Sequence, residues 1–157
     1  DYKLSMSVNF YGTLNIIYEV LPHMLARRSG HIVVVSSVDG RKGLPQDAAY
    51  VSSKYAVTGF TEVLRQELRG TGVYASTIFP GRVDTPMIAR LKVPWVSAKI
   101  SSDRVATVIV RAIRKRKAES IVPYPGPKTL IVLSAISPRL GDWLVRMFRR
   151  EGKEETT

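Results

Sequence analysis

Tyr50 and Lys54 form the pair of residues whose types and spacing could support proton transfer. On a helix, a separation of four residues places both side chains on the same face. A neighbouring ammonium group favours the phenolate and lowers the tyrosine pKa from its unperturbed value of about 10. A tyrosine shifted in this way can donate or accept a proton near neutral pH. The same spacing also occurs on ordinary helix surfaces, so the surrounding residues decide between the two interpretations.

Two further polar residues, Ser37 and Asn9, precede the pair in the sequence and could lie near it in the fold. Ser37 follows the apolar run 31–36 and lies thirteen positions before Tyr50. Taken alone, it fits a hydroxyl that caps a turn. Asn9 lies within a segment of helical periodicity and, taken alone, fits a polar position on a helix surface.

Two helices and two strands must position these residues. Apolar residues recur at helical spacing over 4–28, and a second helix is predicted over 48–69. The nearly continuous apolar run 31–36 suits a strand buried on both faces of a parallel sheet. The β-branched run 73–79 predicts another strand, which Pro80-Gly81 ends. The order helix, strand, helix, strand is typical of βαβ crossovers.

The second half of the chain predicts shorter elements. A helix is expected over 103–117, because serines can cap its start and its last turn is rich in Lys and Arg. Residues 120–123 could form one more strand. The apolar run 128–136 is too short to span a bilayer, and 140–148 predicts an amphipathic helix with a basic face. We expect one domain over residues 1–150, followed by a polar tail over 151–157.

The composition narrows the classes of function. The net charge of +11, from 24 basic and 13 acidic residues, can favour anionic partners. No nucleic-acid-binding motif accompanies it, so we expect no nucleic-acid partner. The absence of cysteine excludes disulfides and a thiolate nucleophile. His23 fits a helix face and His31 begins a strand, so no metal site is expected.

The motifs between Val8 and Pro86, roughly half of the chain, together resemble those of the short-chain dehydrogenase/reductase family. Each motif is weak alone, but five in the right order are specific. The resemblance places the family's catalytic tetrad at Asn9, Ser37, Tyr50 and Lys54. It places the cofactor contacts at Tyr50, Lys54, Pro80, Gly81, Val83 and Thr85. The implied reaction is hydride transfer between NAD or NADP and a carbonyl or alcohol.

The same resemblance implies a role for each residue. Tyr50 would donate a proton to the carbonyl oxygen during reduction, or remove it during oxidation. Ser37 would hydrogen-bond that oxygen and stabilise the charge developing there. Lys54 would lower the Tyr50 pKa and hold the nicotinamide ribose. Asn9 would interrupt its helix and position a water linked to Lys54, and Gly81 would let the backbone approach the cofactor closely.

The sequence departs from the family pattern in one respect. It contains no Gly-x-x-x-Gly-x-Gly motif, whose turn delivers amides to the cofactor pyrophosphate. We therefore predict an α/β fold with a partial Rossmann-type, doubly wound parallel sheet, comprising the last three strands and their helices. The chain begins at Asp1, which suggests a start inside a longer polypeptide. Such a remnant exposes an edge and apolar helix faces, so we predict a homo-oligomer that forms through helices 4–28 and 48–69.

The leading prediction is an NAD(P)-dependent oxidoreductase, located in the cytoplasm, with Tyr50 as general acid and base. The alternative is a catalytically inactive fragment that acts as a dimerisation or scaffold module. The loop 86–99 suggests an apolar small-molecule substrate through five residues: Leu91, Val93, Pro94, Trp95 and Val96. For residues 128–150 we prefer a role in covering the substrate pocket, with peripheral contact to an anionic membrane as the alternative.

Overall fold

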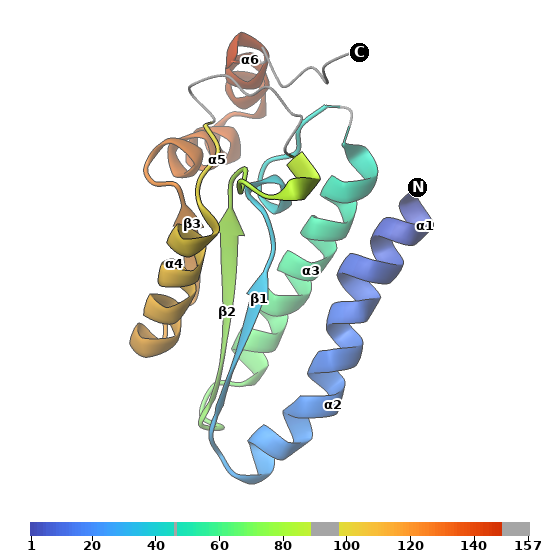
Figure 1. The fold of residues 1–157 in the computed structure, drawn as a ribbon, viewed down its shortest axis with the longest axis vertical. Coiled ribbons are helices and arrows are strands. Elements are labelled where there is room, and N and C mark those ends of the chain that lie inside the picture. The colour runs from blue at the N-terminus through green and yellow to red at the C-terminus, as the bar shows by residue number, and fades with distance from the viewer. Residues whose placement is uncertain (46, 89–97, 149–157) are drawn as a thin grey trace.

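Three parallel strands form one sheet in the order β1-β2-β3. The strands are β1 (Gly30–Val35), β2 (Val73–Pro80) and β3 (Glu119–Val122). Each rises toward the same end of the molecule (Figure 1). The computed structural model describes residues 1–45, 47–88 and 98–148. The predicted α/β class with a parallel three-stranded sheet is confirmed.

One layer of helices comes from the first half of the chain. Its first part, predicted as one helix over 4–28, consists of three consecutive helical segments: α1 (Tyr2–Ser5), a π-helical turn η1 (Met6–Tyr11) and α2 (Gly12–Ala26). Beside it lies α3 (Ala48–Glu67), which ends two residues before the predicted boundary. Figure 1 shows α2 and α3 side by side on one face of the sheet. The opposite face is covered by α4 (Ser102–Lys115), which follows its predicted N-cap Ser101.

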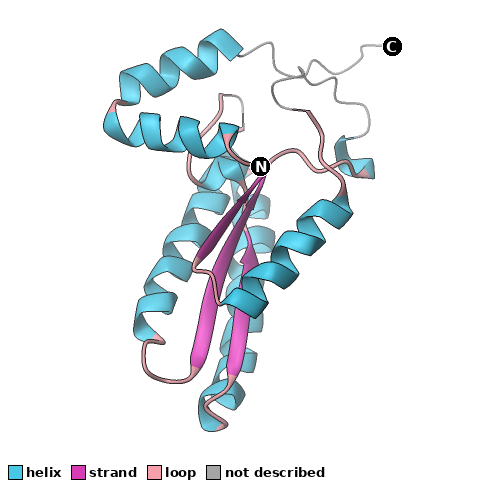
Figure 2. Cartoon of the chain, turned by 90° about the vertical axis from the view of Figure 1, so that its left-hand side faces the viewer, coloured by secondary structure: helices cyan, strands magenta, loops and turns pink. Residues whose placement is uncertain are grey.

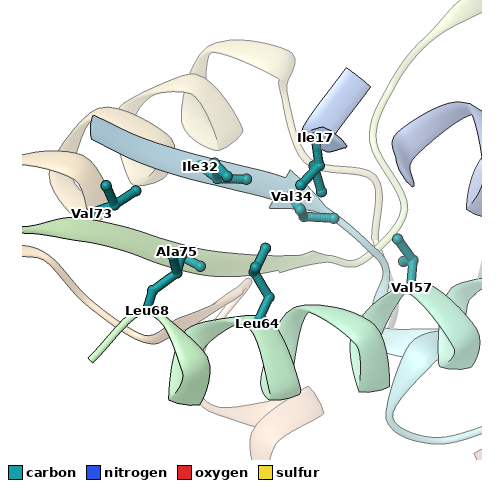
Figure 3. Close-up of a cluster of buried hydrophobic side chains, with 8 residues drawn as sticks. All are labelled: Ile17, Ile32, Val34, Val57, Leu64, Leu68, Val73 and Ala75. Atoms are coloured by element: carbon teal, nitrogen blue, oxygen red, sulfur yellow. The ribbon is translucent and has the colours of Figure 1, made fainter. Parts of the chain in front are cut away.

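The main core lies between β1, β2 and these two long helices (Figure 3). Its eight buried side chains are Ile17, Ile32, Val34, Val57, Leu64, Leu68, Val73 and Ala75. Burial of each leucine contributes about 1.5–3 kcal/mol relative to an exposed position. A second, smaller cluster of Ile100, Val105 and Val122 joins α4 to β3. The central strand β2 is the most protected, since Ile78 and Phe79 are both 0% exposed.

The C-terminal part forms two helices, α5 (Gly126–Ile136) and α6 (Pro138–Phe148). The apolar run 128–136 is thus helical, and the amphipathic helix predicted over 140–148 begins two residues earlier than expected. The two helices lie at the end of the molecule where the strands finish (Figures 1 and 2). Among the described residues, no helix is long and apolar enough to cross a membrane.

Two short 3-10 helices complete this end of the molecule: η2 (Val38–Gly40) follows β1, and η3 (Pro86–Ile88) follows β2. The loop after η2 is tied to its surroundings by charged side chains. Arg41 pairs with Glu119 at the start of β3, and its guanidinium lies 5.1 Å from the centre of the Phe79 ring. Lys42 pairs with Asp142 of α6 at 2.7 Å. The segment that follows β1 is therefore held against both the sheet and the C-terminal helices.

Candidate active site

Asn9 lies in the π-helical turn η1, where hydrogen bonds span one residue more than in an α-helix. The backbone amide of Gly12 accordingly bonds the carbonyl of Ser7. The Thr13 hydroxyl donates to the Asn9 carbonyl at 2.8 Å. The interruption of the helix that the family resemblance implied at Asn9 is therefore present.

Ser53, for which the sequence predicted no role, connects Asn9 to Tyr50. Its hydroxyl accepts a hydrogen bond from Asn9 Nδ2 at 3.0 Å and donates to the Tyr50 carbonyl at 2.7 Å. The side chain is 0% exposed. The signal that could have found it is helical periodicity, because Ser53 lies one turn before the buried Val57 on the core face of α3.

Ser37 lies directly after β1 and serves as the N-cap of η2. Its Oγ accepts a hydrogen bond from the Asp39 amide at 3.1 Å and donates to Asp39 Oδ2 at 3.3 Å. The Ser37 side chain also lies close enough to Tyr50 to lower the pKa of the phenol. The turn-capping interpretation is thus correct, and the same hydroxyl also reaches the tyrosine. Ser36 points the other way, and its Oγ bonds Thr58 Oγ1 at 2.9 Å, which ties the end of β1 to α3.

Tyr50 lies in the first turn of α3 and is partly exposed, at 37%. Burial of the phenol raises its pKa above the ordinary value, because a charged phenolate is poorly solvated there. The nearby Ser37 hydroxyl lowers the pKa, and the carboxylates of Asp39 and Asp47 raise it. The expectation of a lowered Tyr50 pKa is therefore wrong for the described chain.

The position of the Lys54 ammonium explains this difference. Its nitrogen lies over the Tyr50 ring, 5.6 Å from the ring centre. It donates a hydrogen bond to the Val35 carbonyl at the end of β1, at 3.3 Å. Burial lowers the pKa of this ammonium group. The four-residue spacing brings the two side chains together as predicted, but the charge is directed toward the strand end.

The predicted cofactor segment continues from the buried end of β2. Pro80 is the last residue of the strand, and the Gly81 amide bonds the Val122 carbonyl at 2.7 Å. A side chain at Gly81 would begin 3.2 Å from Pro123 Cδ, a tight approach, so packing against the end of β3 favours a small residue there. Val83 forms an isolated parallel bridge with Ile100.

This segment lies beside the residues that follow β1. The Ser36 amide bonds the Ile78 carbonyl at 2.9 Å, which aligns the ends of the two strands. Thr85 is partly buried, and its carbonyl accepts a bond from the Ile88 amide at 3.0 Å. The five apolar loop residues expected to select the substrate lie outside the described residues: Leu91, Val93, Pro94, Trp95 and Val96.

Neither histidine belongs to this group of residues. His31 lies at the opposite end of β1 from Ser37, and its Nε2 is 2.6 Å from Ser76 Oγ. Burial lowers its pKa. Within residues 1–45, 47–88 and 98–148, no three His, Asp or Glu side chains gather as a metal site would require.

The chain is similar to known proteins in both sequence and fold. The family model of short chain dehydrogenases matches residues 1–93. The chain is 33% identical over 162 residues to dehydrogenase/reductase SDR family member 7B from Danio rerio, covering 96% of the chain and 52% of that relative. It is 32% identical to the SDR family protein 7-like of Drosophila melanogaster, covering 89% of the chain and 46% of the relative. The chain thus spans about half the length of the curated relatives it matches.

The fold of the chain also matches those of solved structures. A short chain dehydrogenase from Burkholderia cenocepacia, in complex with NADP, superposes with a TM-score of 0.78 at 26% identity. The match covers 95% of this chain and 59% of that one. Acetoin dehydrogenase YohF from Salmonella typhimurium, at 22% identity and a TM-score of 0.66, shares the fold over 77% of the chain. With a family match over residues 1–93 and its motif residues gathered at one end of the sheet, the chain belongs to the short chain dehydrogenase family.

Proposed function

We propose that this chain supplies the proton-transfer part of an NAD(P)-dependent oxidoreductase that interconverts a carbonyl and an alcohol. The observation that carries the proposal is the gathering of Ser37, Tyr50 and the Lys54 ammonium at the carboxyl end of β1. In open α/β sheets, ligands bind at this end of the strands. The family assignment supports the oxidoreductase class.

Tyr50 is the residue that transfers the proton. The phenol is protonated at neutral pH, which is the form that can donate to a carbonyl oxygen, and its raised pKa means that the phenolate left behind must be stabilised by its neighbours. Ser37 stands beside it with a hydroxyl that can share a hydrogen bond with the same oxygen, as negative charge develops there. Asn9 and Ser53 hold the first turn of α3, on which Tyr50 lies.

The residues present fit the ribose end of a nicotinamide cofactor. Among the described residues, the Lys54 ammonium donates a single hydrogen bond, to the Val35 carbonyl, so two of its three protons remain for ligand hydroxyls. The NADP in the Burkholderia relative supports a nicotinamide cofactor. When bound, that cofactor supplies or accepts the hydride. Val83 and Thr85, in the segment that follows β2, are the further proposed contacts.

The test is turnover by the native polypeptide that contains this chain, with NADH or NADPH and a series of apolar ketones. Tyr50→Phe should lower kcat by about 10²–10⁴-fold, the usual contribution of general acid catalysis. Tyr55→Phe is the matched control, because Tyr55 lies on the same helix and is exposed. Turnover that survives Tyr50→Phe at the control rate would refute the role of Tyr50.

The second candidate function is a dimerisation or scaffold module without catalysis. It is favoured by large apolar side chains exposed on α1, η1, α2 and α3: Leu4, Val8, Tyr11, Tyr18, Tyr55 and Val63. Covering such a patch with a second copy removes apolar area from water. Binding of NADPH at micromolar concentration, followed by its fluorescence, would rule out a purely structural role.

A further inference from the structure

The outer face of α6 combines an apolar stripe with cationic side chains. Leu140, Trp143 and Met147 are spaced by three and four residues, so they lie on one side of the helix. They are 39%, 52% and 51% exposed. The opposite side is fixed against α5, because a side chain at Gly141 would begin 2.2 Å from Ser134 Oγ. The orientation of α6 is therefore set by close packing, and its apolar stripe faces outward.

Cationic residues accompany this stripe. Arg139 and Arg146 are seven residues apart, so they share a face of α6 that adjoins the apolar stripe. The one carboxylate in α5 and α6, Asp142, is paired with Lys42 at 2.7 Å. Lys42 also lowers the pKa of Asp142. The charge next to the apolar stripe, carried by Arg139 and Arg146, is therefore positive.

Helix α5 adds exposed apolar side chains to the same two-helix unit. Val132 is 46% exposed, and Ile136, where α5 ends, is 77% exposed. Ile136 is separated from α6 by Ser137 alone. Figure 2 shows α5 and α6 joined at one end and extending beside the carboxyl end of the strands. This two-helix unit therefore presents its apolar side chains near the end of the sheet that carries Tyr50.

We propose that the outer face of α6 docks on an anionic membrane surface. An 11-residue helix is far too short to span a bilayer, but it can lie in the interface plane with its apolar side inserted. Tryptophan is favoured at the boundary between headgroups and acyl chains. Arginine can bury its stem and keep its charge at the phosphates. The charge of +11 for the whole chain attracts the same surface.

The test is co-sedimentation of the purified protein with vesicles of phosphatidylcholine alone or with 30% phosphatidylserine (on the order of that used to mimic anionic leaflets). We expect binding to the anionic vesicles, weakened by salt. Replacing Leu140, Trp143 and Met147 together by Gln should reduce the bound fraction at least about fivefold, since the inserted area is lost. Arg139→Gln with Arg146→Gln should weaken binding to anionic vesicles only.

Helix α4 provides matched controls. It also exposes two apolar residues, Val110 and Ile113, and carries Arg111 and Arg114. Replacing Arg111 and Arg114 by Gln lowers the net charge by the same amount as replacing Arg139 and Arg146 by Gln. The α4 variant should nevertheless leave binding to the vesicles unchanged. Glutamine at Val110 and Ile113 is the control for lost apolar surface. Equal losses from the α4 and α6 variants would refute a specific face.

A second measurement separates membrane docking from a structural role of the stripe. After Trp95→Phe, Trp143 is the remaining tryptophan of this chain, and its emission should be quenched by brominated lipids. If a part of the protein or a second copy covers the stripe, the triple variant should lower the unfolding midpoint or the solution mass instead. That result, with no quenching and unchanged sedimentation, would overturn the proposal. Because neither readout uses turnover, the outcome is independent of the proposed catalytic role.

Discussion

Ser53→Ala removes the hydroxyl that joins Asn9 to the first turn of α3. Asn9 Nδ2 loses its acceptor at 3.0 Å, and a partly buried donor without a partner costs about 1–3 kcal/mol. The Tyr50 carbonyl loses a bond at 2.7 Å but continues to accept within the helix, so its loss is smaller. The better helix propensity of alanine returns about 0.5 kcal/mol. We expect the free energy of unfolding to fall by about 2 kcal/mol.

Urea denaturation monitored by circular dichroism measures this change. With a slope of about 2 kcal/mol per molar urea, the midpoint should fall by roughly 1 M. Ser52→Ala is the matched control, because Ser52 is the exposed neighbour in the same helix and should change the midpoint little. A double-mutant cycle with Asn9→Ala should give a coupling energy of about 1 kcal/mol, since both variants break the same bond. Equal midpoints for the Ser52 and Ser53 variants, or strict additivity with Asn9→Ala, would refute the reasoning.

Three further predictions follow from single features. Because burial raises the Tyr50 pKa above 10.0, the phenol's contribution to stability is complete below about pH 10 and is lost as pH rises through the folded-state pKa. Urea midpoints measured from pH 8 to 11 should therefore fall less steeply with pH in Tyr50→Phe than in Tyr55→Phe. Parallel curves for the two variants would contradict the raised pKa. Gly72→Ala should destabilise the fold by more than about 1 kcal/mol, the cost of a side chain at positive φ, because φ is +87° and the new Cβ would lie 2.2 Å from the Arg28 carbonyl oxygen. The thermal unfolding midpoint measures this loss. Gly59→Ala is the control, because the space around Gly59 is open. Tyr18→Glu should shift the mass measured by sedimentation toward a monomer, since Tyr18 is 62% exposed on the helix proposed for self-association. An unchanged mass would argue against self-association through this helix.

The helices and strands were predictable because their signals are local. The run 73–79 is apolar, β-branched and ended by Pro80-Gly81, and β2 follows those limits to within one residue. The core face of α3 could also be inferred from helical spacing. The π-helical turn at Asn9 could not, because one extra residue in a single turn barely alters an apolar pattern over 4–28.

The sequence predicted which residues form the candidate site better than it predicted the contacts between them. Sequence spacing placed Tyr50 and Lys54 on one helix face, and Ser37 at the end of the preceding strand. It carried no information on which acceptor the flexible lysine would choose. The structure directs that ammonium to the Val35 carbonyl, which belongs to a residue nineteen positions earlier. Long-range contacts of this kind, including the bond between Asn9 and Ser53, depend on how whole elements pack.

This choice of acceptor has a consequence for the proton transfer proposed for Tyr50. With burial and two carboxylates acting against ionisation, Tyr50 is held as a neutral phenol, the form that donates to a carbonyl. Donation leaves the phenolate, and removal of a proton from an alcohol begins with it, so each unit of raised pKa costs about 1.4 kcal/mol in either direction. Lys54, which already lies over the phenol ring, is a cation placed to offset this cost. Both directions of the proposed reaction therefore require the ammonium to move from the Val35 carbonyl toward the phenolic oxygen as the phenolate forms.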